Sequence, residues 1–305
     1  MTISLPTPRT ARPLPKVDPF RDRGAYARLL TSIYPAEAAA LTGFRLLTDP
    51  RYVEPSDLFD KAARRLIDDE EKHLADVAEL LARLGVHEIP PPSPAELELW
   101  EGWRRGDLFV LPYKANIASL FCLFSEGLGF AILHTLHAAT LDPAMKAALA
   151  RNLDDEEMHL RLSITVLERA LKRDPDFLAD FMVYLSGYAF LARKPLREMR
   201  PVLEDLGFDF DASFGAAVRF VFELLQIAIA RAGQQAPLWL VADRVTRILG
   251  EHPEVARVLH WSMFLPEPPL ARRAVYLWGR WRAARRAPFA TSPRVADSLR
   301  AEHAS

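Results

Sequence analysis

The feature that most constrains this chain is a run of four acidic residues before a histidine, and it occurs twice. Residues 66–77 read LIDDEEKHLADV, and residues 153–164 read LDDEEMHLRLSI. Adjacent like charges repel one another and weaken a helix, so the repeated run must be compensated by its surroundings. Because three residues turn a helix by about 300°, the Glu and the His of each Glu-x-x-His share a face and can reach one metal ion.

Each run follows an isolated acid in an apolar helical stretch. Glu37 lies in IYPAEAAAL, 33 residues before Glu70, and Glu126 lies in CLFSEGLGFAIL, 30 residues before Glu156. Burial of a lone carboxylate is costly unless it has a partner or a metal ion. The alternative interpretation, two solvated faces of surface helices, does not account for Glu37 and Glu126. The tandem order therefore favours a metal site between helices.

Apolar residues recur at helical spacing through most of the chain, and no segment alternates as a half-buried strand would. Four stretches predict helices of about 25–30 residues, each about 40 Å long, which is typical of a four-helix bundle. They are residues 26–47, 55–84, 115–140 and 142–172. We expect an all-α chain with a flexible N-terminal arm at 1–19, a bundle at 20–173, and a helical extension at 174–305 that packs on the bundle.

The composition indicates which cellular location and which binding partners to expect. The formal net charge of −1 gives no overall field that would attract nucleic acid. The single cysteine, Cys122, cannot form an intrachain disulfide, which favours a reducing, cytoplasmic location. The N-terminus has no apolar signal segment. The most apolar stretch, 213–230, is interrupted by Arg219 and Glu223, so we expect a buried helix and no membrane span.

The order Glu, Glu-x-x-His, Glu, Glu-x-x-His resembles that of the ferritin-like di-iron carboxylate proteins, in which these side chains point into a four-helix bundle. The resemblance implies a cofactor of two iron ions, with a manganese and iron pair as the alternative. It implies that Glu70 and Glu156 bridge the ions. The complete ligand set that it implies is Glu37, Glu70, His73, Glu126, Glu156 and His159.

The same resemblance assigns roles around these ligands. Asp69 and Asp155 would each accept the Nδ1 proton of the histidine in the opposite run, which leaves Nε2 for the metal. The other acids of the runs, such as Glu71 and Glu157, would face outward. Tyr34, one turn before Glu37, is a candidate catalytic residue; the alternative is a core-packing role, which is the more common one.

Among enzymes of this class, the chain is most similar to soluble acyl-carrier-protein desaturases. The similarity covers residues 140–182, including ITVLERALKRDPDFLADFM after the second run, together with the ligand types. It departs at Gly129, where the desaturases would have a threonine. The resemblance thus implies a di-iron oxidoreductase, an oxygenase or oxidase that uses O2 on a mostly apolar small-molecule or acyl substrate. The alternative is a ferroxidase, an iron-handling protein or a peroxide scavenger without an organic substrate.

No reductase segment is evident, so such an enzyme would need an external electron-donor protein. A homodimer is one expected assembly. Hydroxylation, desaturation, deformylation and N-oxidation all remain open at this point.

Overall fold

The computed structural model describes residues 3–10, 12–48, 57–89, 114–173 and 197–233. Within these ranges all the long regular elements are helices and the one β-bridge joins Val17 to Thr140, which confirms the predicted all-α class. The long helices are α1 (Arg23–Thr48), α2 (Asp57–Arg83), α4 (Lys114–Ala139), α5 (Pro143–Arg173) and α7 (Phe210–Arg231). The first four of these coincide with the predicted helical stretches to within a few residues.

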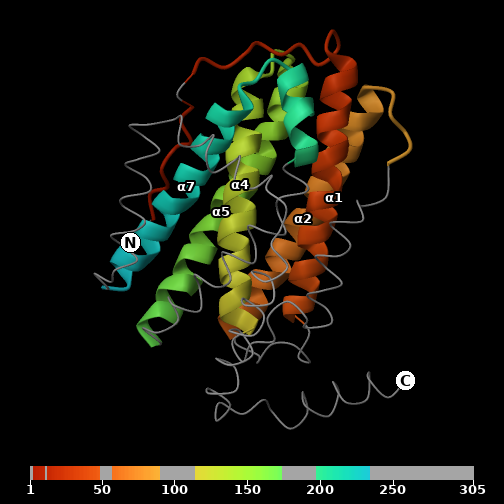
Figure 1. Cartoon of the computed structure of the whole chain (residues 1–305). Helices are drawn as coiled ribbons and strands as arrows, with labels where there is room; N and C mark the ends of the chain where they lie inside the picture. Colours follow the sequence, from red (N-terminus) through yellow and green to blue (C-terminus); the bar gives the residue numbers. More distant parts are fainter. Residues whose placement is uncertain (1–2, 11, 49–56, 90–113, 174–196, 234–305) are drawn as a thin grey trace, which may run out of the picture.

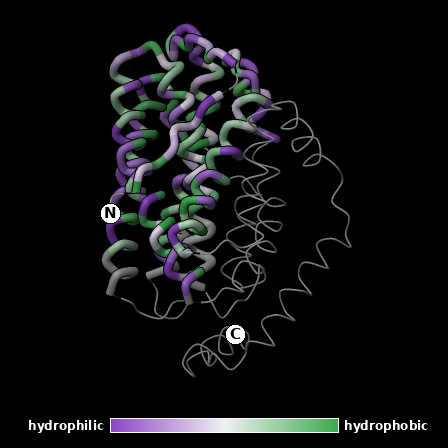
Figure 2. Tube along the Cα trace, turned by 90° about the vertical axis from the view of Figure 1, so that its left-hand side faces the viewer, coloured by the Kyte–Doolittle hydropathy of each residue, from purple (hydrophilic) through white to green (hydrophobic). Residues whose placement is uncertain are grey.

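The described helices lie side by side in two pairs with α7 added to one of them (Figure 1). α1 packs on α2, α4 packs on α5, and α7 covers α4 and α5. The two pairs also meet directly, because α2 contacts α5. Each pair therefore consists of one helix with an isolated Glu and one with a Glu-x-x-His run. Hydrophobic residues (green) and hydrophilic residues (purple) alternate along the described helices in Figure 2, as expected when one side of each helix is buried.

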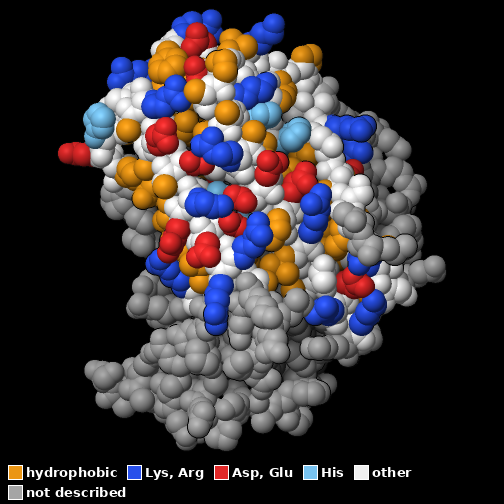
Figure 3. Space-filling model, turned by 180° about the vertical axis from the view of Figure 1, so that it is seen from behind, with side chains coloured by type: hydrophobic (Ala, Val, Ile, Leu, Met, Phe, Trp, Pro, Cys, Tyr) orange, Lys and Arg blue, Asp and Glu red, His pale blue; other side chains and the backbone are white. Residues whose placement is uncertain are grey.

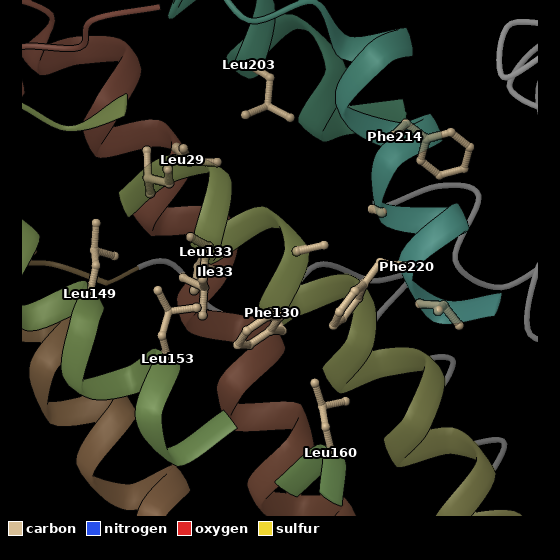
Figure 4. Packing of buried hydrophobic residues seen from close by; sticks show 14 of the residues in the cluster. Leu29, Ile33, Phe130, Leu133, Leu149, Leu153, Leu160, Leu203, Phe214 and Phe220 are labelled. Atoms are coloured by element: carbon tan, nitrogen blue, oxygen red, sulfur yellow. The ribbon is translucent and has the colours of Figure 1, made fainter. Parts of the chain in front are cut away.

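α7 packs on α4 through apolar side chains. The rings of Phe130 on α4 and Phe220 on α7 are stacked with centroids 5.3 Å apart (Figure 4). Among the described residues, α7 is the one helix that is long and apolar enough to cross a membrane, and half of that stretch is buried within the protein. Of the expected C-terminal extension, only residues 197–233 are described.

The N-terminal segment contributes buried residues to the core, whereas the sequence predicted a flexible or surface-draped arm there. Ile3 and Val17 are buried, and Val17 exchanges backbone hydrogen bonds with Ala139 and Leu141 at 2.9 Å. The guanidinium of Arg161 donates to the carbonyl of Ile3. In Figure 1 the segment follows α7 and then crosses the ends of the helices toward α1. Its apolar side chains are the physical reason for this path, since they remove apolar surface from water.

The close approach of α4 and α7 predicts different outcomes for two neighbouring glycines. A Cβ atom at Gly127 would lie 2.9 Å from Cγ2 of Val221, whereas a Cβ atom at Gly129 would meet no described atom within 4 Å. Alanine in place of helical glycine gains up to about 1 kcal/mol of helix propensity at either position. We expect Gly129→Ala to be more stable than Gly127→Ala by about 1–3 kcal/mol, the usual cost of overpacking.

Urea unfolding of the two variants measures that difference directly. Because both substitutions lie in the same helix, the gain in helix propensity cancels in the difference between their unfolding free energies. Equal unfolding free energies would show that α4 and α7 do not pack closely at Gly127.

Candidate metal centre

The structure brings the six predicted ligands together at the centre of the helices. Glu37 comes from α1, Glu70 and His73 from α2, Glu126 from α4, and Glu156 and His159 from α5. All six are buried, with exposed fractions of at most 9%. Local helix geometry accounts for each Glu-x-x-His pair, and the pairing of α1 with α2 and of α4 with α5 supplies the isolated glutamates.

The six side chains form two overlapping groups that could each hold a metal ion. Glu37, Glu70, His73 and Glu156 form the first group; Glu70, Glu126, Glu156 and His159 form the second. Within each group one ligand atom per residue lies within 4.8 Å of all the others. We call these groups position A and position B. Glu70 and Glu156 belong to both, as two carboxylates that bridge neighbouring ions would.

The hydrogen bonding of these residues also fits a cation. Several buried atoms have no hydrogen-bond partner among the described residues, although buried polar atoms nearly always have one. They are both carboxylate oxygens of Glu70, both ring nitrogens of His73 and of His159, and one oxygen each of Glu156 and Asp69. Four carboxylates and two imidazoles are the donor set that suits divalent iron or manganese. Two divalent cations would also balance the four negative charges.

The structure corrects one predicted detail, the ring nitrogen that faces the ligands. Nδ1 of His73 lies 3.5 Å from Glu37 and 3.6 Å from Glu156, while its Nε2 lies 3.7 Å from Asp155. His159 has the same arrangement: its Nδ1 lies 3.6 Å from Glu70 and its Nε2 lies 3.5 Å from Asp69. The sequence interpretation had these nitrogens reversed.

The reason for this orientation is the length of the imidazole. Nδ1 is next to the ring atom attached to the side chain, so it stays close to its own helix and to the glutamate three residues earlier. Nε2 is at the far end of the ring and extends to the facing helix, where the aspartate lies. The predicted cross-pairing holds, since Asp155 on α5 is close to His73 on α2 and Asp69 on α2 is close to His159 on α5.

The remaining acids of the two runs point outward, as predicted. Asp68 and Asp154 are exposed. Glu71 pairs with Arg45 of α1 at 2.6 Å, and Glu157 pairs with Arg161 at 2.6 Å. Each acidic run is therefore divided between two faces of its helix, and arginines compensate the outer face.

Burial and mutual repulsion change the pKa values of the two carboxylates that belong to both positions. Burial, and then repulsion from Glu37 and Glu126, raise the pKa of Glu70 well above its ordinary value. Burial and repulsion from Glu126 do the same to the pKa of Glu156. Burial also acts to raise the pKa of Glu126, but interactions with His159 and Glu156 outweigh it, and that pKa is lowered.

The imidazoles respond in the opposite sense, because they are cations when protonated. Burial acts to lower the pKa of His73, but Glu37 and Glu156 outweigh it and raise the pKa to about 8. For His159, burial is likewise outweighed, chiefly by Asp69, and the pKa lies well above its ordinary value. Without a metal ion, the cluster therefore favours protons, which partly replace the missing positive charge.

Three further residues contact the histidines or their aspartates, and sequence reasoning missed all of them; one is Arg65, which lies 3.5 Å from Asp69. The ring of Phe44 on α1 packs edge-on against His159, with centroids 6.2 Å apart. Lys72 donates hydrogen bonds to Asp69 at 2.8 Å and to Asp155 at 3.1 Å. The Asp69-x-x-Lys72 spacing is a weak sequence signal for the first of these bonds, whereas nothing in the sequence indicates the second.

Tyr34 is partly buried and packs against the apolar core one turn before Glu37, and its catalytic role remains a prediction. Cys122 lies in α4, and its side chain is outside the described part.

No family model, curated protein or solved structure matches the chain.

The overlap of positions A and B predicts the metal content of single variants. Glu70→Gln or Glu156→Gln removes a ligand from both positions, so we expect most of the binding of two ions to be lost. Glu37→Gln or Glu126→Gln removes a ligand from one position, so about one ion per chain should remain. Elemental analysis after anaerobic loading with Fe²⁺ measures the number of iron ions bound per chain.

Glu71→Gln is the matched control for Glu70→Gln, because it removes the adjacent carboxylate from the outer face of the same helix. The Glu71→Gln variant should bind as many metal ions per chain as the unmodified protein. Equal losses in the Glu70 and Glu71 variants would contradict the assignment of the ligands.

The raised imidazole pKa predicts how the stability of chelator-treated protein depends on pH. A pKa of about 8 for His73 in the folded state exceeds the ordinary value of 6.5, so its stabilising effect is complete below pH 6.5 and is lost as the pH rises through 8. The expected loss is about 2 kcal/mol of unfolding free energy. The raised pKa values of Glu70 and Glu156 act in the same direction.

Urea unfolding at pH 6.5 and pH 8.5 measures this loss. His134→Gln, which removes a half-buried histidine elsewhere on α4, should leave the difference nearly unchanged. A metal-free protein that is as stable at pH 8.5 as at pH 6.5 would contradict the described electrostatics.

Proposed function

We propose that the chain is an oxidoreductase with a ferritin-like four-helix bundle formed by α1, α2, α4 and α5. Its cofactor would be two iron ions, or a manganese and iron pair, held at positions A and B. The observation that supports this most directly is the pair of overlapping four-residue groups, each with ligand atoms within 4.8 Å of one another. When bound, such a metal pair supplies the reduction of O2 and the oxidising power for an organic substrate.

The protein's own residues would prepare the site for this chemistry. Glu70 and Glu156 belong to both positions and would help to hold an ion at either of them. Asp69 and Asp155 would hold Nε2–H of the facing histidines, so that the unprotonated Nδ1 of each is available as a ligand. Electrons would come from a separate donor protein, as the sequence predicts.

The surroundings of the site favour an apolar substrate. Several residues one turn from the ligands on the same helices are buried and apolar, namely Ile33, Leu41, Leu123, Phe130 and Leu160, whereas Asn152 and Ser163 are buried polar residues at the same spacing. Together with Phe44 beside His159, the apolar residues exclude water and provide contacts that suit hydrocarbon better than hydrated ions. This supports oxidation of a mostly apolar small-molecule or acyl substrate.

The alternative, a ferroxidase or peroxide scavenger, would be favoured by an acidic entrance for cations. The shallow depression on α2 above the site contains Asp68, Asp69 and Glu71, but Arg64, Arg65 and Lys72 line it as well. Figure 3, which views the molecule from behind, likewise shows positive (blue) and negative (red) side chains intermixed on the described surface. The described surface near the site thus provides no negative field to guide iron inward.

One experiment compares the two functions. The protein is loaded anaerobically with two Fe²⁺ per chain, reduced with dithionite and a mediator, and exposed to O2 with long-chain acyl thioesters, aldehydes or amines. We expect at least one of these classes to increase O2 uptake and to yield an oxidised product by mass spectrometry. Glu126→Gln, which removes a ligand from position B, should abolish product formation.

Oxidation of many Fe²⁺ per chain without any organic product would instead support the ferroxidase. A protein that binds neither iron nor manganese would exclude both functions.

A further inference from the structure

The side chain of Lys72 lies between two aspartates next to the candidate metal centre. Its ammonium group donates to Asp69 on its own helix at 2.8 Å and to Asp155 on α5 at 3.1 Å. Each aspartate in turn lies beside Nε2 of a histidine, Asp69 beside His159 and Asp155 beside His73. One lysine therefore connects both histidine–aspartate pairs. Hydrogen bonds between charged groups of this kind are about twice as strong as neutral ones.

The sequence makes this lysine unique within the repeat. The two runs, Asp-Asp-Glu-Glu-x-His, are identical except at x, which is Lys72 in the first run and Met158 in the second. The contacts of the two runs are otherwise reciprocal, because each histidine meets the aspartate of the other run. A single lysine at this position is sufficient, since its flexible stem brings one point charge within reach of both carboxylates.

We infer that Lys72 is a positioning residue that couples positions A and B, so that both metal ions depend on it although it contacts neither group of ligands. The inference rests on the proposed function, because it assumes that the two positions bind metal. Lys72 keeps Asp69 and Asp155 close together and oriented toward the histidines. Without it the two carboxylates would repel each other, and both imidazoles would lose a fixed partner.

The effect should be unequal at the two positions. Asp69 is buried and also lies 3.5 Å from Arg65, so it retains one cation when Lys72 is removed. Among the described residues, Asp155 has only Lys72 and His73 within ion-pair distance. Position A, which contains His73, should therefore weaken more than position B.

A simpler role for Lys72 would be to hold α2 against α5 at the surface. The structure provides a matched control for this role, because Arg151 on α5 pairs with Asp76 on α2 at 3.1 Å. The exposed fractions are also alike, at 58% and 21% for Arg151 and Asp76 and at 60% and 22% for Lys72 and Asp155. Arg151→Met removes a cross-helix ion pair of the same kind that does not contact the histidines.

The test is anaerobic titration of the metal-free full chain with Co²⁺, whose visible absorption reports its ligands. We expect the unmodified protein and Arg151→Met to bind two Co²⁺ per chain with the same affinity. Lys72→Met should lower the affinity at both positions by about tenfold, as removal of an outer-shell partner usually does, and should lower it more at the position of His73. Asp155 lies beside His73, so Asp155→Asn should change the visible absorption of Co²⁺ at position A. The band that changes in this variant is thereby assigned to position A.

A double variant, Lys72→Met with Met158→Lys, moves the lysine to the second run. Because each histidine meets the aspartate of the other run, we expect a lysine at 158 to reach the same two aspartates and most of the lost affinity to return. Urea unfolding of each metal-free variant shows whether a change in affinity is a change in folding, and Lys72→Gln replaces Lys72→Met if the latter does not fold.

The outcomes separate the inference from the proposed function. If Lys72→Met binds Co²⁺ as tightly as Arg151→Met, or if the double variant recovers nothing, the inference is wrong while the metal centre stands. If the unmodified protein binds no Co²⁺, Fe²⁺ or Mn²⁺, the proposed function and the inference both fail.

Discussion

The structure depends on a balance between four buried carboxylates and the positive charge that surrounds them. Glu37, Glu70, Glu126 and Glu156 are at most 9% exposed, and the desolvation of even one unpaired charge costs several kcal/mol. Apolar packing of the helices must supply the free energy that brings these groups together. Leu29, Leu81, Leu136, Leu149 and Leu224 are fully or almost fully buried and contribute to that packing. Such a cluster is difficult to explain as a purely structural core, because apolar residues of similar volume would pack there without the electrostatic cost.

The compensation is arranged in layers around the carboxylates. The imidazoles of His73 and His159 lie closest, the carboxylates of Asp69 and Asp155 lie behind them, and Lys72 joins these two at the surface. Charge thus alternates in sign from the centre to the solvent when the imidazoles carry protons or bound cations. The alternation explains why a chain keeps Asp next to Glu in both runs: the two side chains lie beside different nitrogens of the histidine in the other run, as Asp69 and Glu70 do at Nε2 and Nδ1 of His159.

The residues of the candidate metal centre could be predicted from the sequence because their signals are local. Glu-x-x-His depends only on helix periodicity, and an isolated acid such as Glu126 stands out in an apolar stretch. The ring orientation of His73 could not be predicted from spacing, because it depends on how far the facing helix lies from its own. Lys72 and Asp155 are 83 positions apart in the sequence, and their contact exists only because α2 packs against α5. The burial of Ile3 and Val17 likewise results from tertiary packing that no local pattern records.

α5 shows how one helix can serve the site and the fold at once. Its inner face presents Glu156 and His159 to the cluster, while on its outer face Arg161 binds both Glu157 and the carbonyl of Ile3. Consecutive residues on a helix are about 100° apart, so Glu156 and Glu157 necessarily face different surroundings. An acid that would only add repulsion inside the cluster is used outside to orient the arginine that holds the N-terminal segment. Because both functions lie on one rigid helix, the packing of that segment and of α7 against α5 fixes the direction in which the ligands point. The apolar outer contacts therefore contribute to the geometry of the site even though they do not touch it.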